Sequence, residues 1–160
     1  MREAIVDCGP LLAFLDAKEA RHFEVVHAMR DLPLPLLTVE SVLSELAFLL
    51  RRNGKPSARC GEIVASGMLE VVPLFPDEAG RLTALMERYS NVPMSLADAG
   101  LVRLSELYPR APIFTFDSDF LIYRRNQNEV LPLIPPPRRV QEEPATYIAD
   151  APISPSTEKT

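Results

Sequence analysis

Short apolar runs alternate along this sequence with longer segments in which apolar side chains recur at helical spacing. The short runs are bounded by turn residues, which is typical of buried strands. They predict five strands, at 4–6, 36–38, 69–74, 113–116 and 130–134. The longer segments predict helices at 11–15, 16–29, 39–52, 57–66, 77–89, 95–107 and 120–124. Strands that alternate with helices in this way indicate an α/β fold with a parallel sheet.

Polar residues mark where some of the predicted helices begin. Asp16 and Glu19 have the spacing of a capping box, which would open the helix that runs to residue 29. Asp77 and Ser95 each stand before a helical pattern, so we expect them to cap those helices.

The composition divides the chain into a globular part and a tail. A chain of 160 residues, 47% of them hydrophobic, suits one domain with a substantial core, which we place at residues 1–134. From residue 135 onward, six of the 16 prolines alternate with Ser, Thr and charged residues. Such a segment buries too little apolar surface to offset the entropy of ordering it. Residues 135–160 are therefore expected to form a Pro-rich flexible C-terminal tail.

Composition and charge also limit the setting and the partners. No apolar stretch approaches the roughly 20 residues of a membrane-spanning helix, and Cys8 and Cys60 are too few for a disulfide framework. We therefore expect a protein of the reducing cytoplasm that does not bind membranes. The net charge of −5 is unusual for a protein that binds nucleic acid. Net charge governs non-specific attraction, however, and divalent cations can bridge acidic side chains to phosphates.

Four acidic residues occupy unusual places in the pattern. Asp7 ends the first apolar run before a Gly-Pro turn, and Asp117 ends the fourth run. In open α/β sheets, ligands bind at the carboxyl ends of the strands. Glu45 and Asp98 lie at the border of apolar helical faces, although Asp and Glu are rarely buried without partners. We predict that these four carboxylates converge on one site.

Four carboxylates in one cavity repel one another strongly. Two unit charges about 4 Å apart interact by roughly 4 kcal/mol at the dielectric usual near protein surfaces, and several such pairs exceed a domain stability of about 5–15 kcal/mol. Such a site must therefore bind protons or cations. Oxygen ligands without His or Cys favour Mg²⁺ or Mn²⁺, and carboxylate sites of this kind serve phosphodiester chemistry.

Each acid also has a purely local interpretation. Asp7 could cap the helix that follows it, and Asp98 stands at capping-box spacing from a serine. Asp117 could form an Asx turn, with Asp119 capping the next short helix. Glu45 could be an ordinary exposed residue of its helix.

Two basic clusters are candidates for contacts with a nucleic-acid backbone. One comprises Arg51, Arg52 and Lys55, and the other comprises Arg124 and Arg125. Ordinary solvated charge is the competing interpretation of both clusters. Our candidate phosphate contacts are Arg51, Arg52 and Arg124.

Four short motifs carry the acids. They are Ile5-Val6-Asp7-Cys8-Gly9-Pro10-Leu11-Leu12, Val42-Leu43-Ser44-Glu45-Leu46, Ser95-Leu96-Ala97-Asp98-Ala99 and Thr115-Phe116-Asp117-Ser118-Asp119-Phe120. In order and spacing they resemble the motifs of PIN-domain nucleases, most closely those of the VapC-type toxins of bacterial and archaeal toxin–antitoxin pairs. The likeness extends over residues 3–134 and leaves only the tail outside.

This resemblance implies a three-layer α/β/α sandwich with a five-stranded, mainly parallel sheet. It also implies an endoribonuclease that cleaves single-stranded RNA with a metal-activated water, using Mg²⁺ or Mn²⁺ and leaving 5′-phosphate and 3′-hydroxyl ends. The family's catalytic, metal-binding quartet matches Asp7, Glu45, Asp98 and Asp117. Thr115 matches its supporting hydroxyl residue, and Asp119 falls within the last motif, where it would support a second metal. Such toxins are usually homodimers that an antitoxin protein silences.

The sequence departs from the family pattern at a few positions. Gly9 stands where many relatives have Ser or Thr, so a hydroxyl contact is missing. Val102 and Arg103 replace small residues that are common after the third acid, and the Pro-rich tail is not a family feature. None of these departures removes a predicted metal ligand.

Two other functions remain open. One is a catalytically degenerate PIN-like binding module, which would bind no metal and would tolerate amides in place of the acids. The other is a haloacid-dehalogenase-like phosphatase, which Asp117-Ser118-Asp119 suggests. In that class the nucleophilic Asp stands early and a long chain follows it, whereas here only a short remainder follows.

Overall fold

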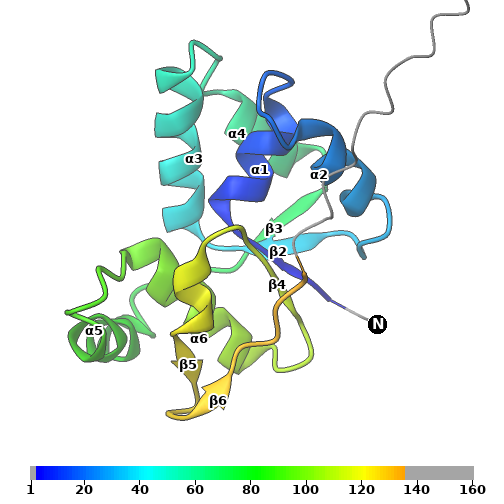
Figure 1. Cartoon of the computed structure of the whole chain (residues 1–160). Helices are drawn as coiled ribbons and strands as arrows, with labels where there is room; N and C mark the ends of the chain where they lie inside the picture. Colours follow the sequence, from blue (N-terminus) through cyan, green and yellow to red (C-terminus); the bar gives the residue numbers. More distant parts are fainter. Residues whose placement is uncertain (1–2, 136–160) are drawn as a thin grey trace, which may run out of the picture.

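The computed structural model describes residues 3–135. Its α-helices are α1 (Cys8–Leu15), α2 (His22–Met29), α3 (Glu40–Arg52), α4 (Arg59–Ala65), α5 (Ala79–Arg88) and α6 (Leu96–Leu107). The strands are β1 (Ile5–Val6), β2 (Leu36–Thr38), β3 (Leu69–Val71), β4 (Ile113–Phe114), β5 (Arg124–Arg125) and β6 (Glu129–Val130), and a 3₁₀ helix, η1, spans Ser118–Leu121. Figure 1 shows these elements along the chain. The expected flexible tail lies outside the described residues, apart from Pro135.

Four short strands form a parallel sheet in the order β3-β2-β1-β4. Ile5 of the central strand β1 pairs with Leu37 on one side and with Ile113 on the other. The residues of β1, β2 and β4 are all buried, which is expected of parallel strands covered on both faces. The prediction of an α/β fold with a mainly parallel sheet is confirmed.

The sheet has four parallel strands, and the prediction of a fifth at 130–134 is wrong. Within that stretch Val130 belongs to β6, which pairs antiparallel with β5 in a separate hairpin. Only one parallel bridge, between Ile113 and Leu133, extends the main sheet. The reason is local, because Pro132 has no N–H to donate to a strand ladder. Asn126 and Gln127 also adopt positive φ angles of 46° and 74°, which turn the chain into the hairpin.

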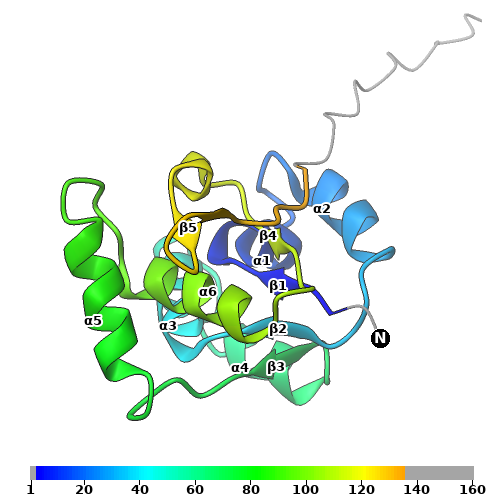
Figure 2. The ribbon, with the colours of Figure 1, turned by 90° about the horizontal axis from the view of Figure 1, so that it is seen from below.

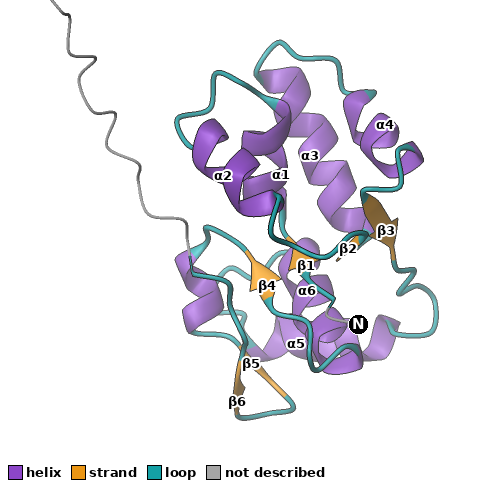
Figure 3. Ribbon diagram, turned by 90° about the vertical axis from the view of Figure 1, so that its right-hand side faces the viewer, coloured by secondary structure: helices purple, strands orange, loops and turns teal. Residues whose placement is uncertain are grey.

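The helices cover both faces of the sheet. Figure 3 shows α1, α2, α3 and α4 on one side and α5 and α6 on the other. Helix α6 packs against β1, and α5 packs against α6 (Figure 2). This arrangement is the expected three-layer sandwich. None of the helices between residues 3 and 135 combines the length and the apolar character that crossing a bilayer requires.

Two of the predicted helix starts are wrong, and one is confirmed. Helix α2 begins only at His22, because the carboxylate of Asp16 accepts from the N–H of Lys18 at 3.0 Å and pairs with the ammonium of Lys55 at 3.2 Å. Asp77 does not cap α5, whose N-cap residue is Glu78, without a side-chain hydrogen bond. Ser95 caps α6 as predicted.

The order of the strands creates a switch point beside β1. The chain moves outward from β1 through β2 to β3 and then returns to add β4 on the opposite side of β1. Ligands of open α/β sheets bind outside the carboxyl ends of the strands at such a reversal. Asp7 directly follows β1, and Asp117 follows β4 by three residues. The topology therefore brings the first and the last acid of the predicted quartet to the same edge of the sheet.

Candidate active site

Asp7 is the most deeply buried of the four acids, with 7% of its surface exposed. It stands between β1 and α1, and its Oδ1 accepts from the N–H of Cys8 at 2.6 Å. Its Oδ2 accepts from the hydroxyl of Thr115 at 2.6 Å. One carboxylate oxygen thus caps the helix, and the other joins the two strands at the switch point.

The environment of Asp7 opposes its ionisation. Burial raises the pKa of its carboxyl from 3.8 to about 6, although the hydrogen bonds from Thr115 and Cys8 lower it. The negative charges of Asp98 and Glu45 raise the pKa further. The site therefore favours either a proton or a cation at Asp7.

Asp98 lies in the first turn of α6 and forms a capping box with Ser95. The N–H of Asp98 donates to the Ser95 hydroxyl at 3.0 Å, and the N–H of Ser95 donates to Asp98 Oδ2 at 2.9 Å. The same Oδ2 accepts from the hydroxyl of Tyr123 at 3.4 Å. Burial and the charge of Asp117 raise the pKa of the Asp98 carboxyl, against the lowering effect of its hydrogen bonds with Ser95 and Tyr123.

Glu45 projects from the middle of α3 and is exposed. Partial burial raises its pKa, and the charges of Asp98 and Asp117 raise it further. Helices α3 and α6 approach closely at Gly100, where a Cβ atom would stand 3.0 Å from Cγ2 of Val39. The missing side chain at this position lets the first turn of α6 lie against the start of α3.

Asp117, the fourth acid, lies between β4 and η1. Its Oδ1 accepts from the N–H of Asp119 at 2.8 Å, and its own N–H donates to the Thr115 hydroxyl at 3.0 Å. Asp117 is thus the N-cap of η1, whereas Asp119, expected as a cap, lies inside that short helix. Thr115 bridges the backbone of Asp117 to the carboxylate of Asp7.

Three of the four acids have the local roles that the sequence also allowed. Asp7 caps a helix, Asp98 completes a capping box and Asp117 forms an Asx turn. Each of these interactions fixes the orientation of a carboxylate without using all of its lone pairs. The charges of Asp98 and Glu45 act on Asp7, and the charge of Asp117 acts on Glu45 and on Asp98.

The donor chemistry of the set suits a hard divalent cation, since all of its side-chain donors are carboxylate oxygens. Burial, and then the charges of neighbouring acids, raise the pKa values of Asp7, Glu45 and Asp98, which is expected of carboxyl groups that lack a counter-ion. Over residues 3–135, however, no group of three or more His, Cys, Asp or Glu side chains is arranged so that it could hold a metal ion. The chemical type of these side chains therefore suits a metal ion, but the positions of the side chains do not form a complete set of ligands around one ion.

Solved structures share this architecture. VapC20 from Mycobacterium tuberculosis, described as a sarcin–ricin loop cleaving toxin, is 22% identical; the alignment covers 73% of this chain and 92% of that one, with a TM-score of 0.67. A toxin–antitoxin complex from Klebsiella pneumoniae contains a chain that is 19% identical to this one. The alignment covers 74% of this chain and 90% of the matched chain, with a TM-score of 0.55. The chain has the fold of a VapC-type toxin. No family model matches the sequence, and no curated protein matches it. The predicted resemblance is thus confirmed at the level of the fold.

Within this VapC-like fold, the three candidate phosphate contacts differ in their surroundings. Arg51 and Arg52 are exposed in the last turn of α3. Arg52 follows Glu45 by two helical turns and so lies on the same side of α3, roughly 10 Å further along the axis. Arg124 is half-buried, and its guanidinium donates to the carbonyls of Leu121, Ile122 and Tyr123 at 2.8, 3.0 and 2.8 Å.

Two features of the site were not found by sequence reasoning. Tyr123 contacts Asp98, and no local motif joins residues from such distant segments. Arg21 places its guanidinium 3.8 Å from the centre of the Phe116 ring, beside Asp117 in the chain. The Phe116 ring lies 3.4 Å from the position of a Cβ at Gly9. This distance is an ordinary van der Waals contact, so the ring would tolerate a Cβ at Gly9, a departure from the family pattern.

An apolar groove of about 590 Å³ borders Glu45 on the α3 side. Glu45 and Ser95 line it together with the exposed apolar side chains of Phe48, Phe75 and Leu96. Phe48 is 63% exposed and Phe75 is 53% exposed. Large apolar side chains gathered next to polar groups are typical of an interaction surface.

Proposed function

We propose that this chain is a metal-dependent endoribonuclease that cleaves single-stranded RNA and acts as the toxin of a toxin–antitoxin pair. The observation that supports this proposal is that Asp98 and Glu45 raise the pKa of Asp7, and that Asp117 raises the pKa values of Glu45 and Asp98. Such a set is costly to maintain unless it binds a cation. The fold shared with VapC20, described as a toxin that cleaves the sarcin–ricin loop, supports RNA as the substrate.

The proposed cofactor is Mg²⁺ or Mn²⁺. Asp7, Glu45 and Asp98 would hold the first cation, and Asp117 with Asp119 would support a second one. When bound, these ions lower the pKa of a water and stabilise the leaving oxygen of the phosphodiester.

The side chains of this chain have separate tasks in the proposal. Thr115 and the Cys8 N–H hold Asp7 in a fixed orientation. Asp98 is anchored through Oδ2, so its Oδ1 is the oxygen available to a cation. Exposed Arg51 and Arg52, together with Arg124, are proposed to hold phosphates of the RNA on either side of the scissile bond.

Cleavage of RNA by the purified full chain tests this proposal. A single-stranded RNA and a stem-loop with a sarcin–ricin-like sequence should both be tried with Mn²⁺, Mg²⁺ or EDTA. We expect cut products with 5′-phosphate ends in the presence of either ion and none with EDTA. Asp7→Asn should reduce the rate at least 100-fold, whereas Asp77→Asn, which removes an exposed carboxylate outside the site, should cleave like the wild type. Equal cleavage by Asp7→Asn would end the proposal.

A protein antitoxin is the proposed regulator, and a homodimer is the proposed assembly. The toxin–antitoxin complex with a similar chain and the apolar groove beside Glu45 support a protein partner that covers the site. Co-expression with the product of a neighbouring small reading frame tests this idea. The partner should co-purify with the chain and block cleavage.

The catalytically degenerate binding module remains a second candidate. One observation favours it, namely that no three potential ligands within residues 3–135 are arranged to hold one ion. Calorimetry separates the two candidates directly. The nuclease should bind Mn²⁺ and lose this binding in Asp7→Asn, whereas the binding module should release no heat in either protein.

A further inference from the structure

The side chain of Tyr123 is completely buried next to the acidic site, with 0% of its surface exposed. Its ring makes edge-on contacts with Tyr89 and Phe120, at centroid distances of 5.1 and 5.4 Å. Aromatic pairs in this geometry hold a ring in one orientation. The phenol therefore has little freedom to point elsewhere.

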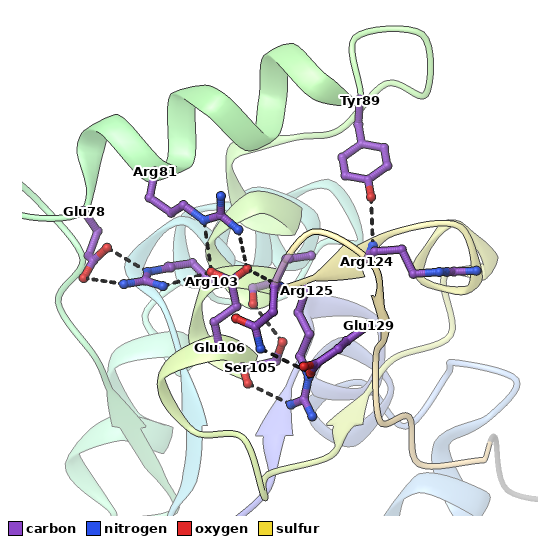
Figure 4. A network of polar contacts seen from close by, with 11 residues as sticks. Glu78, Arg81, Tyr89, Arg103, Ser105, Glu106, Arg124, Arg125 and Glu129 are labelled. Atoms are coloured by element: carbon purple, nitrogen blue, oxygen red, sulfur yellow. Dashed lines mark hydrogen bonds and ion pairs between the residues drawn. The ribbon is translucent and has the colours of Figure 1, made fainter.

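The backbone around Tyr123 is held as firmly as its ring. Its N–H donates to the carbonyl of Asp119 at 3.1 Å, which closes the turn of η1. The guanidinium of Arg124 donates to the Tyr123 carbonyl. The Arg124 N–H donates to the hydroxyl of Tyr89 at 2.9 Å, as Figure 4 shows. The residue thus sits between the end of α5 and the turn that carries Asp117.

The phenolic hydroxyl of Tyr123 donates to Oδ2 of Asp98 at 3.4 Å. This oxygen also accepts from the Ser95 N–H at 2.9 Å. Two donors from different elements thus converge on one oxygen of the carboxylate, which defines the direction of the other oxygen. The contact is long for an O–H···O hydrogen bond, so its contribution belongs at the low end of the usual range.

We infer that Tyr123 is a positioning residue that orients Asp98 for cation binding. This inference rests on the proposed function and adds to it a residue outside the four acidic motifs. Groups that hydrogen-bond to a ligand from behind fix its orientation and commonly affect metal affinity.

Comparing Tyr123→Phe with Tyr89→Phe tests the inference. Both variants keep a buried aromatic ring and remove one hydroxyl, but only the hydroxyl of Tyr123 contacts an acid of the site. Mn²⁺ affinity of the full chain, measured by calorimetry, is the main readout. We expect the dissociation constant to rise about tenfold in Tyr123→Phe and to stay within about twofold of wild type in Tyr89→Phe.

A second measurement separates positioning from a general loss of structure. Thermal unfolding is followed without metal, and the double variant Tyr123→Phe/Asp98→Asn is compared with Asp98→Asn alone. A positioning role predicts that Tyr123→Phe has no further effect on Mn²⁺ binding once Asp98 is an amide. A purely structural role predicts the same additional loss in both backgrounds.

The outcomes also distinguish this inference from the proposed function. If the wild type binds Mn²⁺ and Tyr123→Phe binds it equally well, the inference is overturned and the proposed function stands. A loss in Tyr123→Phe that Tyr89→Phe reproduces overturns it as well. If the wild type binds no Mn²⁺ and cleaves no RNA, the proposed function fails, and the inference fails with it.

Discussion

The hydroxyl of Thr115 donates to the carboxylate of Asp7 at 2.6 Å, and the two residues are 108 positions apart in the chain. Both are buried, with 6% and 7% of their surfaces exposed. The contact joins the end of β4 to the end of β1 and also holds the N–H of Asp117. Two of the four acids are therefore positioned through one hydroxyl group.

Replacing Thr115 by Val should raise the pKa of Asp7 above about 6, because the hydrogen bond from Thr115 lowers this pKa. Carbon-13 NMR of the Asp7 carboxyl measures the shift directly. Thr115→Ser is the matched control, since it keeps the hydroxyl and should leave the pKa within a few tenths of the wild-type value. A Val variant with an unchanged pKa would mean that this hydrogen bond contributes little.

Replacing Asp7 by Asn should stabilise the folded protein at neutral pH. The carboxyl has a pKa of 3.8 when unperturbed and about 6 when folded, so its ionised form disfavours the folded state. Two pKa units correspond to about 3 kcal/mol, and we expect a net gain of about 1–3 kcal/mol for the amide. The difference should be absent below pH 4, grow between pH 4 and 6 and stay constant above. Urea unfolding of both proteins at several pH values, in metal-free buffer, measures the size and the sign of this difference in the free energy of unfolding.

The affinity for Mn²⁺ should depend on pH through Asp7. Below about pH 6 a proton and the cation compete for this carboxylate, so affinity should fall about tenfold per pH unit. Above that pH it should change little. The raised pKa values of Glu45 and Asp98 act in the same direction. Calorimetry in two buffers of different ionisation enthalpy would detect the released proton, and a flat profile from pH 5 to 8 would contradict the prediction.

Gly100→Ala should fail to stabilise α6. A helical Gly→Ala exchange normally stabilises by about 0.5–1 kcal/mol, but here the new Cβ would stand 3.0 Å from Cγ2 of buried Val39. Gly61→Ala in α4 is the matched control, because no atom lies within 4 Å of its Cβ position. We expect Gly61→Ala to raise the melting temperature, and Gly100→Ala to lower it and to weaken Mn²⁺ binding. Equal gains in both variants would show that α3 and α6 adjust freely.

Arg103→Met should destabilise the packing of α5 against α6. Arg103 pairs with Glu78 at 2.7 Å and with Glu106 at 2.9 Å, and the Glu106 side chain is only 2% exposed (Figure 4). Leaving a buried carboxylate with fewer partners costs about 1–3 kcal/mol, although Arg81 still pairs with Glu106. Arg30→Met at the exposed end of α2 is the control and should change stability by less than about 0.5 kcal/mol.

The same network predicts a pH effect on stability. Burial raises the pKa of Glu106, but the hydrogen bonds from Arg81, the Asn126 N–H and Arg103 outweigh it, so the folded-state pKa lies below the usual value of 4.5. This stabilisation is present at neutral pH and is lost as the pH falls through the folded pKa. The stability difference between wild type and Arg103→Met should therefore shrink in acid.

Local patterns were sufficient where the physical cause is local. The apolar run before Asp7 predicted a buried strand, and Ser95 predicted the start of α6, because burial and capping involve neighbours within one turn or strand. The capping box expected at Asp16 did not form, because that carboxylate accepts from the N–H of Lys18 and also pairs with a distant residue, Lys55. The expected fifth strand failed because Val130 pairs with β5 in a hairpin and Pro132 has no N–H to donate to the main sheet.

The sequence by itself determined which residue types stand at strand ends and helix starts, and hence that four carboxylates were available. Only the tertiary structure decided how they are placed, because the return of the chain to the far side of β1 lets the Thr115 hydroxyl join the carboxylate of Asp7 to the backbone of Asp117. Contacts such as Tyr123 to Asp98 and Gly100 to Val39 depend on the packing of separate elements. No periodicity along the chain encodes them, since each joins surfaces that come together only when the sheet is complete.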